Sequence, residues 1–235
     1  MAMPKLTANR VLVVVLLVAA GLAAGLIALS VLGGSDEAKP TTIHGAADTE
    51  ALLAGIPQQG NVLGKADAPV TLVEYADMQC PFCAQWGLDT FPALVQEYVR
   101  AGKVRIVFNG LAFVGPDSLP ALQTAVSAGK QGKLWNVTEL IFHNQGEENT
   151  GWVTDDLLRS IGEAVPGLDA GKMMDGRQSA AVASALADAQ GSAQLAGISS
   201  TPTFEVGRTG GSMTQLHGAL STGEFRQALD SLLQQ

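Results

Sequence analysis

Cysteine is scarce in this sequence, with only Cys80 and Cys83 among 235 residues. A domain held together by disulfides would need several cysteine pairs that close long loops. A disulfide between residues so close in sequence constrains the unfolded chain only slightly. The fold must therefore depend on a hydrophobic core, and the cysteine pair is free for chemistry.

Histidines and basic residues are also few. His44, His143 and His217 stand far apart, and no second Cys-x-x-Cys pair accompanies the first. A structural zinc site needs four such ligands at characteristic spacings, so we expect no metal site. The 14 basic residues are outnumbered by 22 acidic ones, giving a formal net charge of −8. Nucleic acid binding requires clustered Lys and Arg, so we expect no nucleic acid partner.

Charge is absent from residues 11–32, where Val, Leu, Ala, Gly and Ile dominate. Such a segment is long enough to cross a bilayer as a helix, which takes about 20 residues. Lys5 and Arg10 precede it, and a basic flank of this kind stays in the cytoplasm. We therefore expect residues 1–33 to form a cytoplasmic tip and a single-pass membrane anchor. The catalytic part would then lie on the extracytoplasmic side, periplasmic or extracellular.

A cleaved secretory signal is the alternative interpretation of the same residues. Its apolar core would be about 7–15 residues long and would end at a small-x-small site. Ala28-Leu29-Ser30 is a poor match to such a site. The length of the apolar run favours the uncleaved anchor, and both interpretations export the rest of the chain.

A tether and one folded domain are expected after the anchor. Residues 34–60 are small, polar and weakly patterned, which predicts a flexible tether with at most one helical turn near residues 48–53. The folded domain is expected at residues 61–235. Within it, residues 70–76 are β-rich and apolar on both faces, as in a buried central strand, except at Glu74.

A helix and a second strand are predicted after the cysteines. Apolar residues at spacings of three and four indicate a helix, which Pro92 should kink because it removes a backbone donor. Gly102 should end this helix, and residues 104–108 predict a strand. The order strand, helix, strand is typical of a right-handed βαβ unit.

Helices and a hairpin make up the remaining chain. Helical patterns occupy residues 119–130, 134–142, 155–165 and 178–195. Residues 203–208 and 213–219 predict two strands around a Gly-Gly turn. Ser221 and Glu224 match a capping box at the start of a last helix. The order βαβ, helical block, ββα predicts an α/β fold.

Cys80-Pro81-Phe82-Cys83 lies between the predicted strand and helix. A thiol at a helix N-terminus faces the positive end of the helix dipole and free N–H groups, which stabilise its thiolate. Because the thiolate is the nucleophile, we expect Cys80 to react with other thiols and Cys83 to be the buried resolving cysteine. Pro81 suits the first helical turn, which needs no backbone donor. A zinc half-site and an inert structural disulfide are the alternatives.

Four motifs occur together in the expected folded domain: Val73-Glu74-Tyr75, Cys80-Pro81-Phe82-Cys83, Gln131-Gly132-Lys133-Leu134-Trp135 and Thr201-Pro202-Thr203-Phe204. With this combination, residues 61–235 resemble the DsbA-like branch of the thioredoxin superfamily. The resemblance implies a thioredoxin fold with an inserted all-helical domain at about residues 115–198.

The resemblance also implies roles for single residues. Glu74 would be the buried acid beneath the cysteines that helps to move protons, with a raised pKa; a solvent-facing place at a sheet edge is the alternative. Pro202 would be a cis-proline facing the cysteines, and a trans proline at the start of a strand is the alternative. Thr201 would offer backbone groups to an extended substrate segment. Phe82 stands where the family's strongest oxidants carry histidine, so we expect a weaker oxidant.

An oxidase is the function that the resemblance implies. It would pass the Cys80–Cys83 disulfide to cysteine-containing exported proteins through a mixed disulfide at Cys80. A membrane quinone-linked partner of the DsbB or vitamin-K-epoxide-reductase type would reoxidise it. A reductase or isomerase working from the dithiol form and a redox-inert binding or chaperone module are the alternatives. We expect a monomer that needs no cofactor.

Other large apolar side chains are predicted to build the core of the helical block: Trp135, Phe142, Trp152, Met173 and Met174. For Trp86 a place in the core and a place on an apolar surface around the cysteines both stay open.

Overall fold

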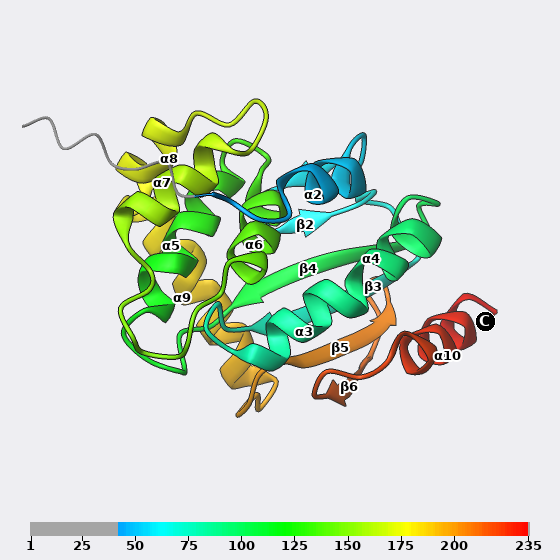
Figure 1. Ribbon diagram of the computed structural model, residues 1–235. Coiled ribbons are helices and arrows are strands. Elements are labelled where there is room, and N and C mark those ends of the chain that lie inside the picture. The colour runs from blue at the N-terminus through cyan, green and yellow to red at the C-terminus, as the bar shows by residue number, and fades with distance from the viewer. Residues whose placement is uncertain (1–41, 235) are drawn as a thin grey trace, which may run out of the picture. The chain divides into compact units, whose positions relative to one another are not determined.

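The computed structural model describes residues 42–234, which form one mixed sheet with helices on both faces (Figure 1). The strand order is β1-β2-β4-β3-β5-β6; β3 and β4 are parallel, and the other neighbours are antiparallel. The strands are β1 (Gln58–Gln59), β2 (Val62–Leu63), β3 (Val70–Ala76), β4 (Val104–Gly110), β5 (Thr203–Arg208) and β6 (Met213–His217).

Apart from α2 and α8, the helices follow the predicted order. They are α2 (Ala46–Leu53), α3 (Pro81–Asp89), α4 (Phe91–Leu94), the π-helical segment η1 (Val95–Val99), α5 (Ser118–Gly129), α6 (Leu134–His143), α7 (Asp155–Glu163), α8 (Ala170–Gly176), α9 (Ala180–Leu195) and α10 (Thr222–Leu233). The thioredoxin-like α/β order, βαβ before the helical block and ββα after it, is confirmed.

β3 is the central strand that the sequence predicts. It pairs with β4 on one side and β5 on the other, and its side chains are buried at almost every position. Its predicted bounds and those of β5 are confirmed, while β4 extends beyond the predicted residues 104–108 to Gly110. The sheet therefore holds the loop that follows β3, with the cysteines, at its centre.

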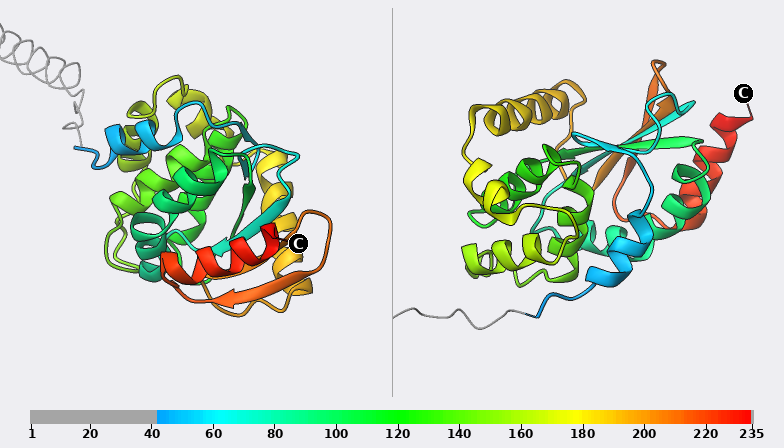
Figure 2. Two further views of the ribbon diagram at one scale, coloured as in Figure 1. Left: turned by 90° about the vertical axis from the view of Figure 1, so that its right-hand side faces the viewer. Right: turned by 90° about the horizontal axis from the view of Figure 1, so that it is seen from above.

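Helices cover both faces of the sheet (Figure 2). Side chains alternate along a strand, so β3 contributes to two separate apolar clusters. Leu72 and Ala76 belong to the main core, which also contains residues of α3, α6 and α10. Val73 and Tyr75 pack instead with Ala193 of α9. The helical block thus contributes α6 to one face and the end of α9 to the other.

The helix after the cysteines is interrupted where Pro92 predicts a kink. α3 ends at Asp89, α4 begins at Phe91 with Pro92 in its first turn, and η1 continues as a π-helix to Val99. Proline cannot donate a backbone hydrogen bond, so the regular α-helical ladder cannot run through it. The apolar stripe on both sides of the break stays buried, including Trp86 and Phe91.

The helical block occupies residues 118–195, close to the predicted insertion. Trp135, Phe142, Met173 and Met174 are buried in its core, and Trp152 packs against them as a half-buried side chain. The short helix α8 was not predicted from the sequence. Two glycines obscure its pattern, and it begins where the Asp169 side chain accepts a hydrogen bond from the Lys172 amide at 3.0 Å.

The prediction of a flexible tether is wrong for residues 42–60, which belong to the folded domain. α2 buries Thr49 and Leu53, and the side chain of Gln58 in β1 donates to Asn136 of α6 at 2.8 Å. Residues 42–60 are largely small and polar. Their contacts with α6 therefore leave no periodic pattern in the sequence. The predicted tether before residue 42 lies outside the described residues.

The predicted membrane anchor, residues 1–33, also lies outside the described residues. Among residues 42–234, none of the helices combines the length and the apolar character needed to span a membrane. At the other end of the chain, the predicted capping box of α10 is confirmed: Ser221 and Glu224 exchange side chain to backbone hydrogen bonds.

Candidate active site

Cys80 and Cys83 lie at the N-terminus of α3, where the sequence predicts them. Cys80 is the N-cap residue with an extended backbone, and Pro81 opens the first turn. Both cysteines are free thiols in this structure. Cys83 is fully buried and Cys80 is 5% exposed, whereas the Phe82 side chain is 60% exposed. Cys80 is therefore the more accessible of two buried cysteines, and it is followed in the chain by residues that carry an exposed aromatic ring.

The surroundings of Cys80 favour its thiolate. Its pKa is lowered to about 6, first by the side-chain hydrogen bond from Cys83 and then by the Thr201 side chain and the backbone amides of Phe82 and Cys83. Burial opposes this shift. Donors at the start of a helix stabilise an anion in this way without any charged side chain. Cys80 can therefore act as a nucleophile near neutral pH.

Cys83 has the opposite electrostatics. Its pKa is raised well above the usual value, first by burial, then by its hydrogen bond to Cys80 and by the charges of Cys80 and Glu74. A cysteine with a raised pKa holds its proton while its neighbour is a thiolate. The pair therefore consists of one reactive thiolate and one buried thiol, which is the asymmetry expected of an attacking and a resolving cysteine.

Thr201 and Pro202 lie directly across from Cys80. The Thr201–Pro202 peptide bond is cis, so the predicted cis bond is confirmed. The thiol of Cys80 donates a hydrogen bond to the Thr201 carbonyl oxygen at 3.3 Å. The fold thus brings together two motifs that lie more than one hundred residues apart in the sequence.

A shallow groove runs beside this pair. It has a volume of about 350 Å³ and is lined by Phe82, Gln85, Thr201, Pro202, Gly218 and Ala219. Trp86 does not lie in it: this ring is buried against Phe204, with 4.7 Å between the ring centroids. The apolar part of the groove therefore comes from Phe82, Pro202 and Ala219, and Trp86 has a place in the core.

Glu74 is buried beneath the cysteines, so the alternative of a solvent-facing place is wrong. It is 1% exposed, and its partners across the sheet are Phe108 on β4 and Phe204 on β5. Neither carboxyl oxygen has a hydrogen-bond partner among the described residues. Burial raises the pKa of Glu74 to about 8, since an apolar pocket penalises the carboxylate. At neutral pH this acid is protonated and can give its proton away.

A polar network that the sequence did not indicate fixes the loop before Cys80. Asp77 accepts from the Gln79 amide at 2.8 Å, and from the amides of Phe113 at 2.6 Å and Val114 at 2.9 Å. Gln145 of the helical block donates to the Cys80 carbonyl oxygen at 3.2 Å. These contacts hold the loop in one conformation and attach it to the helical block.

Gln79 extends this network. It donates to Ser118 at 3.0 Å and accepts from the Asn149 amide at 2.7 Å. Asn149 has a positive φ of 59°, a conformation that asparagine tolerates better than most residues. Apart from the acid at the end of a strand, the sequence carries no pattern that would identify these residues, because their contacts are distant in the chain.

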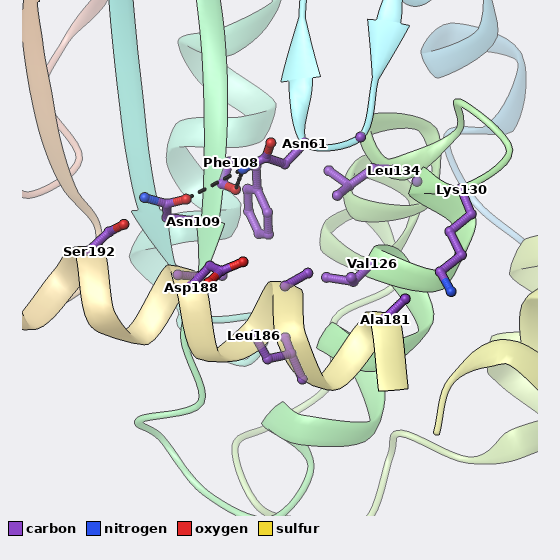
Figure 3. A pocket seen from close by; sticks show the side chains of 15 residues that line it. Asn61, Phe108, Asn109, Val126, Lys130, Leu134, Ala181, Leu186, Asp188 and Ser192 are labelled. Carbon is purple, nitrogen blue, oxygen red and sulfur yellow. Dashed lines mark hydrogen bonds between the residues drawn. The ribbon is translucent and has the colours of Figure 1, made fainter. Parts of the chain in front are cut away.

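Figure 3 shows a second hollow, of about 400 Å³, between α9 and the end of β4. Asn109, Leu186 and Asp188 are among the residues that line it. Neither cysteine, nor Glu74, Thr201 or Pro202, lines this hollow. The thiol chemistry described above does not involve it.

Comparison with known proteins places this site in a family. A family model described as thioredoxin matches residues 58–231. The chain is 39% identical over 110 residues to the probable disulfide bond formation protein D of Bacillus cereus, covering 46% of this chain and 51% of that protein. It is 29% identical over 147 residues to disulfide bond formation protein D of Bacillus subtilis, covering 62% and 66%. The matched segments thus span between half and two thirds of these relatives.

Solved structures give the same result for the fold. The crystal structure of oxidised BdbD from Bacillus subtilis is similar with a TM-score of 0.67 and 25% identity, over 77% of this chain and 98% of that one. The crystal structure of alpha-DsbA1 from Wolbachia pipientis is similar with a TM-score of 0.65 over 79% and 96%, and at 19% identity this likeness concerns the fold alone. The chain therefore belongs to the thioredoxin family, and its fold is similar to those of BdbD and DsbA.

Proposed function

We propose that this protein is an extracytoplasmic thiol–disulfide oxidoreductase that donates its Cys80–Cys83 disulfide to exported proteins. The observation that supports this most directly is the asymmetry of the two cysteines. The pKa of Cys80, the more accessible of the two, is lowered to about 6, and that of the fully buried Cys83 is raised. A stable Cys80 thiolate makes the reduced form favourable and the disulfide a good electron acceptor.

The reaction consists of two exchanges. A substrate thiolate attacks the Cys80 sulfur, a new S–S bond forms, and the Cys80–Cys83 bond breaks with its electron pair on Cys83. Glu74 gives a proton to the Cys83 sulfur, whose raised pKa makes it a poor leaving group without one. A second substrate thiolate then attacks the substrate sulfur of the mixed disulfide, and Cys80 leaves as a thiolate. The substrate is oxidised by two electrons, and the enzyme becomes a dithiol.

Substrate recognition is assigned to the groove beside Cys80. The Thr201 carbonyl oxygen, which accepts from the Cys80 thiol, points at the reacting sulfur. An extended substrate segment in the groove would pair with this backbone and contact Phe82 and Pro202. Main-chain recognition of this kind suits a broad range of unfolded proteins that carry cysteine.

Location and recycling are further parts of the proposal. Residues 1–33 would anchor the chain in the cell membrane as a single pass, with the catalytic domain on the extracytoplasmic side. Disulfides persist in such compartments, which supports an oxidising role. A quinone-linked membrane protein of the DsbB or vitamin-K-epoxide-reductase type would take up the two electrons and restore the Cys80–Cys83 disulfide.

The direction of electron flow is tested in intact cells. Acid quenching followed by alkylation of free thiols gives the redox state of Cys80 and Cys83, with Cys80→Ala and Cys83→Ala variants as references. A mostly oxidised pair is expected of an oxidase. A mostly reduced pair would favour a reductase or isomerase. In addition, Cys83→Ala should accumulate mixed disulfides through Cys80, and their absence would favour a redox-inert binding module.

A further inference from the structure

Gln145, in the loop that follows α6, connects the helical block to the loop that carries Cys80. Its side-chain amide donates to the Met78 carbonyl oxygen at 2.9 Å and to the Cys80 carbonyl oxygen at 3.2 Å. The disulfide exchange described above gives this side chain no part. It is half-buried, so water could take its place without leaving a deep cavity. Its use therefore depends on the two carbonyl groups that it binds.

The loop of Gln145 is attached to the same segment at a second point. The Asn149 backbone amide donates to the Gln79 side chain at 2.7 Å, and the Gln79 side chain donates to the Asn149 side chain at 3.2 Å. Gln79 is fully buried. Together, Gln145 and Asn149 bind each of the three consecutive residues that end at Cys80. The helical block thereby fixes the position of the Gln145 amide relative to the start of α3.

The two carbonyl groups differ in what they need from Gln145. Met78 is fully buried, and a buried carbonyl group requires a donor. The Cys80 carbonyl oxygen already accepts from the backbone amides of Cys83 and Ala84, each at 3.1 Å. A carbonyl oxygen has two lone pairs, and these two amides are enough to fill them. The contact of Gln145 with Cys80 is therefore a third donor, which satisfaction of the carbonyl group does not require.

The Cys83 amide has a second acceptor within reach. Cys80 is the N-cap residue of α3, and Phe82 and Cys83 are the second and third residues of the helix. Amides at these two positions face the N-cap side chain and stabilise an anion there. They are among the causes that lower the pKa of Cys80. The Cys80 carbonyl oxygen and the Cys80 thiolate therefore compete for the N–H group of Cys83.

Gln145 shifts this competition toward the thiolate. With Gln145 present, its amide and that of Ala84 fill both lone pairs of the Cys80 carbonyl oxygen, so the Cys83 amide can turn to the sulfur at little cost. Without Gln145, the thiolate must take the Cys83 amide from a carbonyl oxygen that needs it. The groups that lower the pKa of Cys80 carry no positive charge, so the loss of one neutral donor is not compensated by an ion pair.

We propose, on the basis of the disulfide exchange at Cys80, that Gln145 is a positioning residue: it binds the Cys80 carbonyl group, frees the Cys83 amide for the Cys80 thiolate, and so makes the disulfide a stronger oxidant. It touches neither the substrate nor the sulfur atoms. The oxidised protein has no thiolate, so this contact stabilises the reduced form more than the oxidised form. The effect is the same for either direction of electron flow.

The variant Gln145→Met tests this role, because methionine has a similar length and no N–H donor. Gln131→Met is the matched control: Gln131 is also half-buried in the helical block, and its amide donates to the Asp169 carbonyl oxygen at 3.1 Å. The pKa of Cys80 is measured in each full-length protein from the ultraviolet absorption of its thiolate. Equilibration with glutathione at pH 8 is followed by acid quenching and alkylation. In this equilibrium two glutathione thiols reduce the Cys80–Cys83 disulfide and become one glutathione disulfide.

The pKa of Cys80 should rise by about half a unit to one unit in Gln145→Met, because a hydrogen bond of this kind changes an equilibrium about three- to tenfold. At pH 8, Cys80 is ionised both at its present pKa of about 6 and after this rise. The equilibrium constant for reduction by glutathione should therefore fall by the same factor, which lowers the reduction potential by about 15–30 mV. Gln131→Met should change neither quantity by more than about one and a half times.

Unfolding by denaturant distinguishes this role from a structural one. At pH 8 the unfolding equilibrium constant of reduced Gln145→Met should increase about three- to tenfold more than that of the oxidised variant, since only the reduced form has a thiolate. An equal increase in both forms, with the pKa of Cys80 and the glutathione equilibrium unchanged, would overturn the proposal and leave Gln145 a structural residue. So would a shift of the same size in Gln131→Met.

If Gln145→Met does not fold, the same three measurements are made on Gln145→Ala, which also lacks the donor. A raised pKa of Cys80 with a lower equilibrium constant supports the proposal, and unchanged values overturn it. Failure of the proposed oxidase role would appear instead as a mostly reduced cysteine pair in intact cells. It would leave these differences between the variants and the unmodified protein as they are.

Discussion

Replacing Phe82 by histidine tests how the start of α3 sets the oxidising power. The groups that lower the pKa of Cys80 are a thiol, a hydroxyl and backbone amides, and none of them carries a positive charge. Phe82 is 60% exposed, so a histidine there would be solvated and its imidazolium would lie beside the Cys80 sulfur. Exposed ion pairs contribute up to about 1 kcal/mol, which corresponds to a pKa decrease of somewhat less than about one unit.

The pKa decrease converts directly into a reduction potential. A lower thiolate pKa stabilises the reduced protein, so the potential rises by about 30 mV for each unit while the pKa lies below the working pH. Phe82→His should therefore raise the potential by about 20–30 mV. The strongest oxidants of this kind reach a thiolate pKa of about 3.5. With Cys80 at about 6, the unmodified protein should be about 70 mV less oxidising than those proteins.

The assay equilibrates each protein with glutathione buffers at pH 7 and counts free thiols after alkylation. The pKa of Cys80 is measured in parallel from the ultraviolet absorption of its thiolate. Phe82→Leu is the control, since it removes the ring without adding a charge. A pKa that falls in Phe82→His while the potential stays constant would refute the link between thiolate stability and oxidising power. An unmodified potential equal to that of the strongest oxidants would refute the argument from Phe82.

Three further predictions concern stability. The pKa of Glu74 is about 8 in the folded protein and near 4.5 in the unfolded chain. Between these pH values, Glu74 therefore binds more protons in the folded state than in the unfolded state. The free energy of unfolding should fall by up to about 5 kcal/mol as the pH rises through this window. Denaturant unfolding of oxidised Glu74→Gln at a series of pH values should show a smaller fall. Asp77→Ala leaves the Phe113 and Val114 amides without their acceptor and should cost about 2–4 kcal/mol of unfolding free energy. Ser221→Ala removes a helix cap and should cost about 1 kcal/mol in the same measurement.

The sequence predicts the elements whose evidence is local. β3 and β5 have their predicted bounds, because β3 is a mostly apolar run and β5 is followed by the Gly-Gly turn of a hairpin. Cys80 and Cys83 are found at a helix start because Pro81 and the preceding strand mark that boundary. Glu74 was identified through the family resemblance, and its surroundings explain its burial: the strand is covered on both faces.

Contacts between distant residues could not be predicted in the same way. The attachment of α2 and β1 to α6 depends on Gln58 and Asn136, which lie 78 positions apart. Glu139 stands in an apolar helix like an ordinary polar interruption, and only the packing of α6 on Gly87 shows that its carboxyl group lies against α3. Polar side chains carry little periodicity, so their partners become evident only in the folded structure.

Opposite pKa shifts at Cys80 and Cys83 determine how many protons accompany reduction. Below pH 6 both sulfurs take up a proton with the two electrons, and the reduction potential should fall by about 59 mV per pH unit. Above pH 6 Cys80 stays a thiolate while Cys83 keeps its proton, so the slope should fall to about 30 mV per unit. Reduction potentials measured from pH 5 to 8 in redox buffers of known poise should therefore change slope near pH 6. Cys83→Ser cannot serve as a control because it forms no disulfide. A slope of about 59 mV that continues to pH 8 would mean that Cys80 holds its proton, and the asymmetry on which the proposed oxidase mechanism depends would be absent.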